Sequence, residues 1–195
     1  MPGLRETMAA NLRDFSPVPS NGSLAAAAVA VVVMDGRGSR CVPIFQRTSN
    51  MSRHAGQMAL PGGRLHQGES AEQCAIRELR EELGLSVNSA DVIGVLDDFD
   101  TRSGFTITPV VIWSEAETAA LRPSHDEVAE LYVIAIPELR AAVSRAKPGE
   151  AFSLRLELIE VFAPTAAILY QFSEVALDGR PARVTDFYQP PFTHR

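Results

Sequence analysis

Apolar residues recur along this chain of 195 residues with two periods, one typical of helices and one of strands. Leu4, Met8 and Leu12 are spaced four residues apart, so we expect an amphipathic N-terminal helix, packed either on the core or on a second subunit. A proline-containing linker follows at residues 16–19. The continuous apolar run at residues 24–34 predicts a buried strand, because it is too short for the roughly 20 residues that cross a bilayer.

The rest of the pattern predicts a sheet with helices packed on it. Further strands are expected at residues 57–60, 92–96, 105–113 and 131–135, and further helices at residues 137–147 and 163–175. A turn at residues 35–38 joins the first strand to a hairpin partner at residues 41–46, so the sheet is antiparallel or mixed. The Pro-Gly-Gly sequence at residues 61–63 is expected to break regular structure before the next helix.

That next helix is rich in glutamate, and local signals mark both of its ends. Ser70, followed three residues later by Gln73, is a capping box. Gly84 suits the left-handed conformation that ends a helix. The buried face of the helix is expected to consist of Ala75, Leu79 and Leu83.

Three carboxylates share another face of this helix. Glu78, Glu81 and Glu82 are three and four residues apart and fall within an arc of about 100°. Like charges so close together destabilise the fold unless a cation lies between them, so the spacing indicates a divalent metal site. Carboxylate oxygens favour Mg²⁺ or Mn²⁺. Arg77 is placed to brace Glu81, and Glu69 is expected either to complete the metal shell or to anchor the preceding loop.

Composition and charge narrow the range of partners. A net charge of −6 disfavours nucleic acid, because binding to phosphate backbones needs a basic surface. The two cysteines, Cys41 and Cys74, imply no disulfide framework, and the charged N-terminal segment lacks the pattern of a signal peptide, so we expect a cytoplasmic protein without a membrane partner. We expect an N-terminal helix and linker at residues 1–20, one main domain at residues 21–180 and a C-terminal extension at residues 181–195.

Residues 63–85 resemble the signature box of the Nudix hydrolases. That box is a glycine, five residues, a glutamate, seven residues, Arg-Glu, an apolar residue, any residue, Glu-Glu, any residue, a glycine and an apolar residue. Every defined position is matched, by Gly63, Glu69, Arg77, Glu78, Leu79, Glu81, Glu82, Gly84 and Leu85.

The resemblance implies an α/β fold, the Nudix α/β/α sandwich with a mixed β-sheet, and hydrolysis of a nucleoside diphosphate linked to another group. It implies catalytic roles for Arg77 and for Glu78, Glu81 and Glu82, which hold the metal ions in that family, and it adds Gly63 and Glu69 to the metal site. One glutamate, on this helix or in a nearby loop, acts as the base, and the sequence does not identify which.

The flanking loops are similar to those of the coenzyme A diphosphatase subfamily, notably at residues 53–63 and 101–111. Such enzymes convert coenzyme A or its acyl thioesters to 3′,5′-ADP and 4′-phosphopantetheine or its acyl form. Phosphates need cationic contacts, and the candidate substrate-binding residues are Arg47, Arg53, Gln57 and Arg102.

Two other functions remain open at this point. One is a Nudix diphosphatase that acts on another nucleotide, such as ADP-ribose, NADH or a nucleoside triphosphate. The other is a non-catalytic Nudix module that binds a nucleotide and acts as a regulator. A homodimer is compatible with the amphipathic N-terminal helix.

Overall fold

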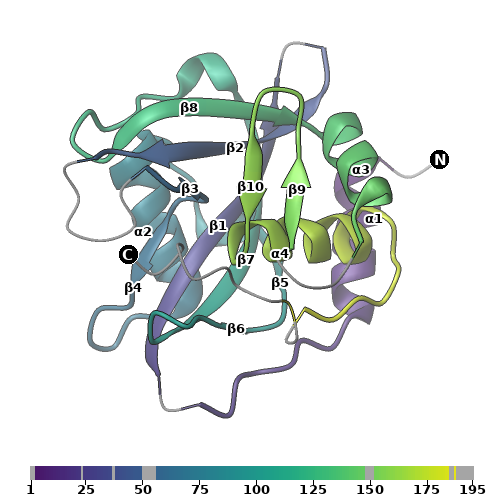
Figure 1. Ribbon diagram of the computed structural model, residues 1–195, viewed down its shortest axis with the longest axis horizontal. Coiled ribbons are helices and arrows are strands. Elements are labelled where there is room, and N and C mark those ends of the chain that lie inside the picture. Colours follow the sequence, from purple (N-terminus) through teal and green to yellow (C-terminus); the bar gives the residue numbers. More distant parts are fainter. Residues whose placement is uncertain are drawn as a thin grey trace.

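The computed structural model describes residues 3–22, 24–36, 38–49, 56–147, 152–184 and 187 (Figure 1). Within these residues, eight strands form one mixed sheet and two more form a separate hairpin. The strands of the large sheet are β1 (Ala25–Asp35), β2 (Arg40–Arg47), β3 (Met58–Ala59), β4 (Gly62–Arg64), β5 (Val92–Val95), β6 (Phe99–Asp100), β7 (Phe105–Glu117) and β8 (Val128–Ala135). The hairpin consists of β9 (Ser153–Arg155) and β10 (Glu160–Phe162).

The helices lie on both faces of this sheet (Figure 1). They are α1 (Leu4–Asp14), α2 (Ala71–Leu83), α3 (Ile136–Arg145) and α4 (Thr165–Gln171), and α4 continues into a π-helical turn, η3 (Phe172–Leu177). Two short 3₁₀ turns, η1 (Ser89–Asp91) and η2 (Thr118–Ala120), complete the described elements.

The central strand, β1, explains how the layers are held together. It pairs in parallel with β7 and antiparallel with β2 and β4. Because side chains alternate along a strand, Val31 and Val33 face the layer of α1, α3 and α4, whereas Ala30 and Val32 face α2. Both cores are closely packed around an apolar strand, which confirms the expected α/β/α arrangement with a mixed sheet.

The N-terminal helix packs on the core of its own chain. Met8 and Leu12 are buried, and they belong to the same hydrophobic cluster as Val31 and Val33 of β1. The linker after α1 is also held, because the backbone N–H of Val18 donates to Oδ1 of the buried Asp97 at 2.7 Å. The apolar face of α1 is therefore already covered within the chain. No helix in the described parts of the chain is long and apolar enough to span a membrane.

One expectation about the strands is wrong. Residues 61–63 were expected to break regular structure, but Gly62–Arg64 forms β4 and pairs with Ala27, Ala28 and Val29 of β1. The reason is steric, since a Cβ on Gly62 would collide with the backbone of β1. The glycine lets the two backbones approach closely enough to pair.

Other elements were missed because they are short. Strand β6 has two residues and strands β9 and β10 have three each, which is too few for a periodic pattern to stand out. The expected C-terminal helix is present, but it becomes π-helical after Gln171.

Candidate active site

The capping interactions expected from the sequence are present at both ends of helix α2. The Ser70 side chain accepts a hydrogen bond from the backbone N–H of Gln73, and the Gln73 side chain accepts one from the backbone N–H of Ser70. Gly84 ends the helix with φ of 67°. A side chain there would also collide with Arg122, so the glycine is required both by its conformation and by its contacts.

Arg77 is the centre of a carboxylate network beside helix α2. Its Nε and Nη2 donate to the two oxygens of Glu69 at 2.8 and 3.0 Å. Its Nη1 donates to Glu78 at 2.6 Å and to Glu81 at 3.1 Å. The guanidinium of Arg77 lowers the pKa of Glu69 to about 2, and the carboxylates in turn raise the pKa of Arg77. In this arrangement Glu69 anchors the loop, because it also accepts from the backbone N–H of His66.

Glu82 lies in a different environment from Glu78 and Glu81. It is 1% exposed, and its Oε2 accepts from the backbone N–H of Gly62 at 2.8 Å. Arg47 Nη1 lies 3.4 Å from its other oxygen. Burial raises the pKa of Glu82 to about 8, although Arg47 and Gly62 both act to lower it. Of the three carboxylates on this helix face, Glu78 and Glu81 therefore pair with Arg77, and Glu82 pairs with Arg47.

Strand β4 connects this helix to a cavity. Gly62 binds Glu82, and a Cβ on Gly63 would collide with the carboxylate of Glu78. Both glycines also line a cavity of about 700 Å³. That volume is in the range of pockets that hold small-molecule ligands and cofactors. The two glycines thus contact the glutamates of α2 and also line the cavity, so these glutamates lie next to the cavity wall.

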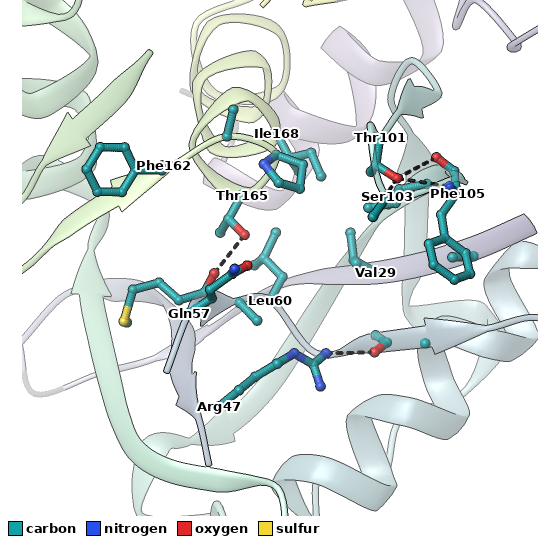
Figure 2. Close-up of a pocket in the computed structure, with 18 of the residues that line it drawn as sticks. Val29, Arg47, Gln57, Leu60, Thr101, Ser103, Phe105, Phe162, Thr165 and Ile168 are labelled. Carbon is teal, nitrogen blue, oxygen red and sulfur yellow. Dashed lines mark hydrogen bonds between the residues drawn. The ribbon is translucent and has the colours of Figure 1, made fainter. Parts of the chain in front are cut away.

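Two arginines line the cavity close to these glycines. Arg47 reaches β4 and donates from Nη2 to the carbonyl oxygen of Gly62 at 3.2 Å (Figure 2). Arg64, the residue after Gly63, lies with its guanidinium 4.7 Å from the centre of the Phe105 ring. The sequence reasoning missed Arg64. Arg64 could have been identified only from its place in β4, and that strand was not expected from the sequence.

The other predicted substrate-binding residues have different positions. Gln57 lines the cavity, as Arg47 does. Arg102 is exposed and is not among the described residues that line the cavity, although its neighbours Thr101 and Ser103 are. Arg53 lies outside the described residues. Its role stays a prediction, as does that of Arg102.

The donors on α2 fit a divalent cation in their chemistry. Glu78, Glu81 and Glu82 supply the hard oxygens that Mg²⁺ and Mn²⁺ prefer, and the absence of a side chain at Gly63 leaves the space that the Glu78 carboxylate takes up. Among the described residues, no group of three or more Asp, Glu, His or Cys side chains is arranged to hold a metal ion. Arg77 and Arg47 lie against the carboxylates instead and supply the positive charge.

The chain is similar in sequence to known proteins. The chain is 39% identical over 96 residues to a protein of Pectobacterium atrosepticum named Uncharacterized Nudix hydrolase NudL, and the match covers 49% of this chain and 50% of that protein. It is 34% identical over 114 residues to Nudix hydrolase 3 of Caenorhabditis elegans, which covers 57% of this chain and 47% of that protein. The chain thus spans about half the length of the curated relatives it matches.

Solved structures and a family model complete the comparison. A NUDIX hydrolase from Nitrosomonas europaea superimposes with a TM-score of 0.56 at 14% identity, over 84% of this chain and 77% of that one. A MutT/nudix family protein from Enterococcus faecalis gives a TM-score of 0.51 at 17% identity, over 83% and 64%. These likenesses show a shared fold. The model described as NUDIX domain matches residues 24–156, which contain strands β1 to β8 and helix α2, and the chain therefore belongs to the NUDIX domain family.

Proposed function

We propose that this protein hydrolyses a nucleoside diphosphate linkage with the help of a divalent metal ion, Mg²⁺ or Mn²⁺. The favoured substrate is coenzyme A or an acyl-coenzyme A, which would give 3′,5′-ADP and 4′-phosphopantetheine or its acyl form. The observation that carries the proposal is the shared position of Gly62 and Gly63, which line the cavity and contact Glu82 and Glu78. A substrate in the cavity would have its diphosphate beside the carboxylates.

The residues of α2 would hold the metal. The proposed ligands are Glu78, Glu81 and Glu82, with Glu69 and the backbone of Gly63 as further candidates. When bound, the cation would neutralise phosphate charge and lower the pKa of a water molecule near the phosphorus. Arg77 holds Glu78 and Glu81 in place through hydrogen bonds of 2.6 and 3.1 Å, as residues behind a metal site commonly do.

The cavity would bind and orient the substrate. Arg47 and Arg64 place two positive charges near β4, where they would attract phosphate oxygens. Gln57 offers an amide on the same cavity surface, and Arg53 and Arg102 remain candidates for further phosphate contacts. The coenzyme A assignment is supported by the similar loops at residues 53–63 and 101–111 and by a cavity that has both charged and apolar lining residues.

A substrate panel tests the proposal. The protein is incubated with Mg²⁺ or Mn²⁺ and with coenzyme A, an acyl-coenzyme A, NADH, ADP-ribose and nucleoside triphosphates, and the products are identified by mass spectrometry. We expect release of 3′,5′-ADP from the coenzyme A compounds. Turnover of ADP-ribose or a triphosphate alone would instead identify a different Nudix diphosphatase. Binding of a nucleotide without any turnover would identify a regulatory module.

Two variants connect turnover to the glutamate helix. Glu82→Gln is expected to abolish hydrolysis while the protein stays folded. Glu6→Gln is the matched control, because Glu6 is an exposed glutamate on α1, on the other face of the sheet. Equal loss in both variants, or no loss in Glu82→Gln, would contradict the metal assignment.

A homodimer and a cytoplasmic location remain predictions.

A further inference from the structure

The end of the cavity away from strand β4 is formed by a different part of the chain. Ile159, Phe162 and Ile168 line it, and they come from the β9–β10 hairpin and helix α4. In Figure 2, Phe162 and Ile168 lie on the other side of Gln57 and Leu60 from Arg47. All three residues follow residue 156, where the match to the family model ends. This wall is thus built by residues beyond the matched part of the chain.

The wall is held against the sheet by a hydrogen bond and by buried neighbours. Thr165, at the first turn of α4, donates from its hydroxyl to the carbonyl oxygen of Met58 on β3 at 3.0 Å (Figure 2). Phe162 pairs with Ser153 across the hairpin, and its neighbours Val161 and Ala163 are 0% and 1% exposed. Phe162 itself is only half-buried and lies on the cavity surface. The anchored neighbours present its ring to the cavity.

The charges along the cavity give it a direction. Arg47 and Arg64 lie toward β4, whereas the charged residue contributed by the hairpin is Glu160. The Glu160 carboxylate accepts from the Ser153 hydroxyl at 2.6 Å, and this bond and the nearby Arg155 lower its pKa, so it is negatively charged at neutral pH. Arg155 offsets part of this charge, so the hairpin end attracts phosphate less than the β4 end, which has Arg47 and Arg64. A substrate would therefore lie with its phosphates toward β4 and an uncharged part toward the hairpin.

We infer that Phe162, with Ile159 and Ile168, determines specificity by binding an aliphatic acyl group on the non-nucleotide half of the substrate. This inference rests on the proposed function, because the position of the diphosphate beside α2 sets the other end of the molecule. It adds a preference, because an acyl chain offers apolar surface to these cavity-lining residues and a free thiol does not. Acyl thioesters with longer chains are therefore better substrates than coenzyme A itself.

The test compares chain length in two variants of one hairpin. Phe162→Ser removes the apolar surface inside the cavity. Leu158→Ser is the matched control, because Leu158 is on the same hairpin, is 84% exposed and is not among the residues that line the cavity. The value of kcat/KM is measured with Mg²⁺ for coenzyme A and for its acetyl, butanoyl and octanoyl thioesters.

In the wild-type protein and in Leu158→Ser, kcat/KM is expected to rise by up to about fourfold for each methylene that enters the apolar end. In Phe162→Ser this rise is expected to be reduced by at least half, measured as the ratio of kcat/KM for each thioester to kcat/KM for coenzyme A in the same variant. A wild-type rate that does not depend on chain length would overturn the inference. So would an equal fall for every substrate in Phe162→Ser.

A binding measurement separates this inference from the proposed function. S-octanoyl-pantetheine lacks the diphosphate, so it cannot be hydrolysed there, and its affinity can be measured by calorimetry. Tighter binding to wild type and Leu158→Ser than to Phe162→Ser supports the apolar site even if no coenzyme A compound is turned over. Equal affinity for all three proteins, or no binding, would refute it even if coenzyme A is hydrolysed.

Discussion

The backbone N–H of Gly62 donates a hydrogen bond to Oε2 of Glu82 over 2.8 Å. Gly62 belongs to β4 and lines the cavity, and Glu82 belongs to α2 and is almost completely buried. The bond therefore joins the cavity to the glutamate helix. A substitution at either residue is therefore expected to disturb both the cavity and the glutamate helix.

The burial of Glu82 predicts how the stability of the metal-free protein depends on pH. Its pKa is raised from 4.5 to about 8 in the folded state, so the folded protein binds this proton more tightly than the unfolded chain does. The resulting stabilisation is fully present below about pH 4.5 and is lost as the pH rises through about 8, by up to about 5 kcal/mol. Unfolding by urea in EDTA, between pH 5 and 9, measures the change. The Glu82→Gln variant should lack this component, and equal pH dependence in both proteins would show that Glu82 is ionised at all these values.

A methyl group at Gly63 is expected to disturb the site directly. The added Cβ of Gly63→Ala collides with the Glu78 carboxylate, so either β4 or the carboxylate must move. We expect a loss of about 1–3 kcal/mol in the free energy of unfolding and a fall in kcat of at least about tenfold. Gly22→Ala is the control, since its nearest contacts, at 3.2 and 3.3 Å, are ends of side chains. Comparable effects of the two substitutions would rule out a specific role for the space at Gly63.

Replacing Arg77 tests whether its geometry matters beyond its charge. Arg77→Lys keeps the positive charge but cannot bind Glu69, Glu78 and Glu81 at the same time. We expect a loss of about 2 kcal/mol in stability and a fall in kcat of about 10- to 100-fold. Arg80→Lys is the matched control, because Arg80 is exposed on the same helix. If Arg77→Lys and Arg80→Lys change stability and kcat equally, the positive charge at position 77 is sufficient and its geometry does not matter.

The linker after α1 depends on the buried Asp97. Its carboxylate accepts from the backbone N–H of Val18, from the Gln171 side chain and from Arg183, with distances of 2.6–2.7 Å. Asp97→Asn removes the charge that pairs with Arg183 and places an amide among donors, so we expect a loss of about 3 kcal/mol in stability. Thermal unfolding measures it. The exposed Asp14→Asn is the control, and an unchanged melting temperature in Asp97→Asn would mean that this network contributes little.

Much of helix α2 could be predicted because its signals are local. The capping box at Ser70 and Gln73 and the left-handed Gly84 each act within one turn of the chain, and the structure contains both. The buried positions Ala75 and Leu79 follow from the same helical period. Such features depend on neighbours in the sequence, so the sequence is enough to find them.

The cavity could not be predicted in the same way. Its wall depends on contacts such as the hydrogen bond from Thr165 to the carbonyl oxygen of Met58, 107 residues earlier. Strand β4 forms only because Gly62 approaches β1 closely, and nothing in the Pro-Gly-Gly sequence indicates that partner. Arg64 and Phe162 therefore had no local signal that connected them to the site.

The sequence by itself determined that Glu78, Glu81 and Glu82 share one face of a helix, because helical periodicity is a property of the backbone. Only the tertiary structure decided their surroundings. Glu78 and Glu81 meet Arg77 on their own helix, whereas Glu82 is buried against Gly62 and Arg47 from other strands. Burial and charge depend on what the fold brings together, so three residues of the same type have different chemistry.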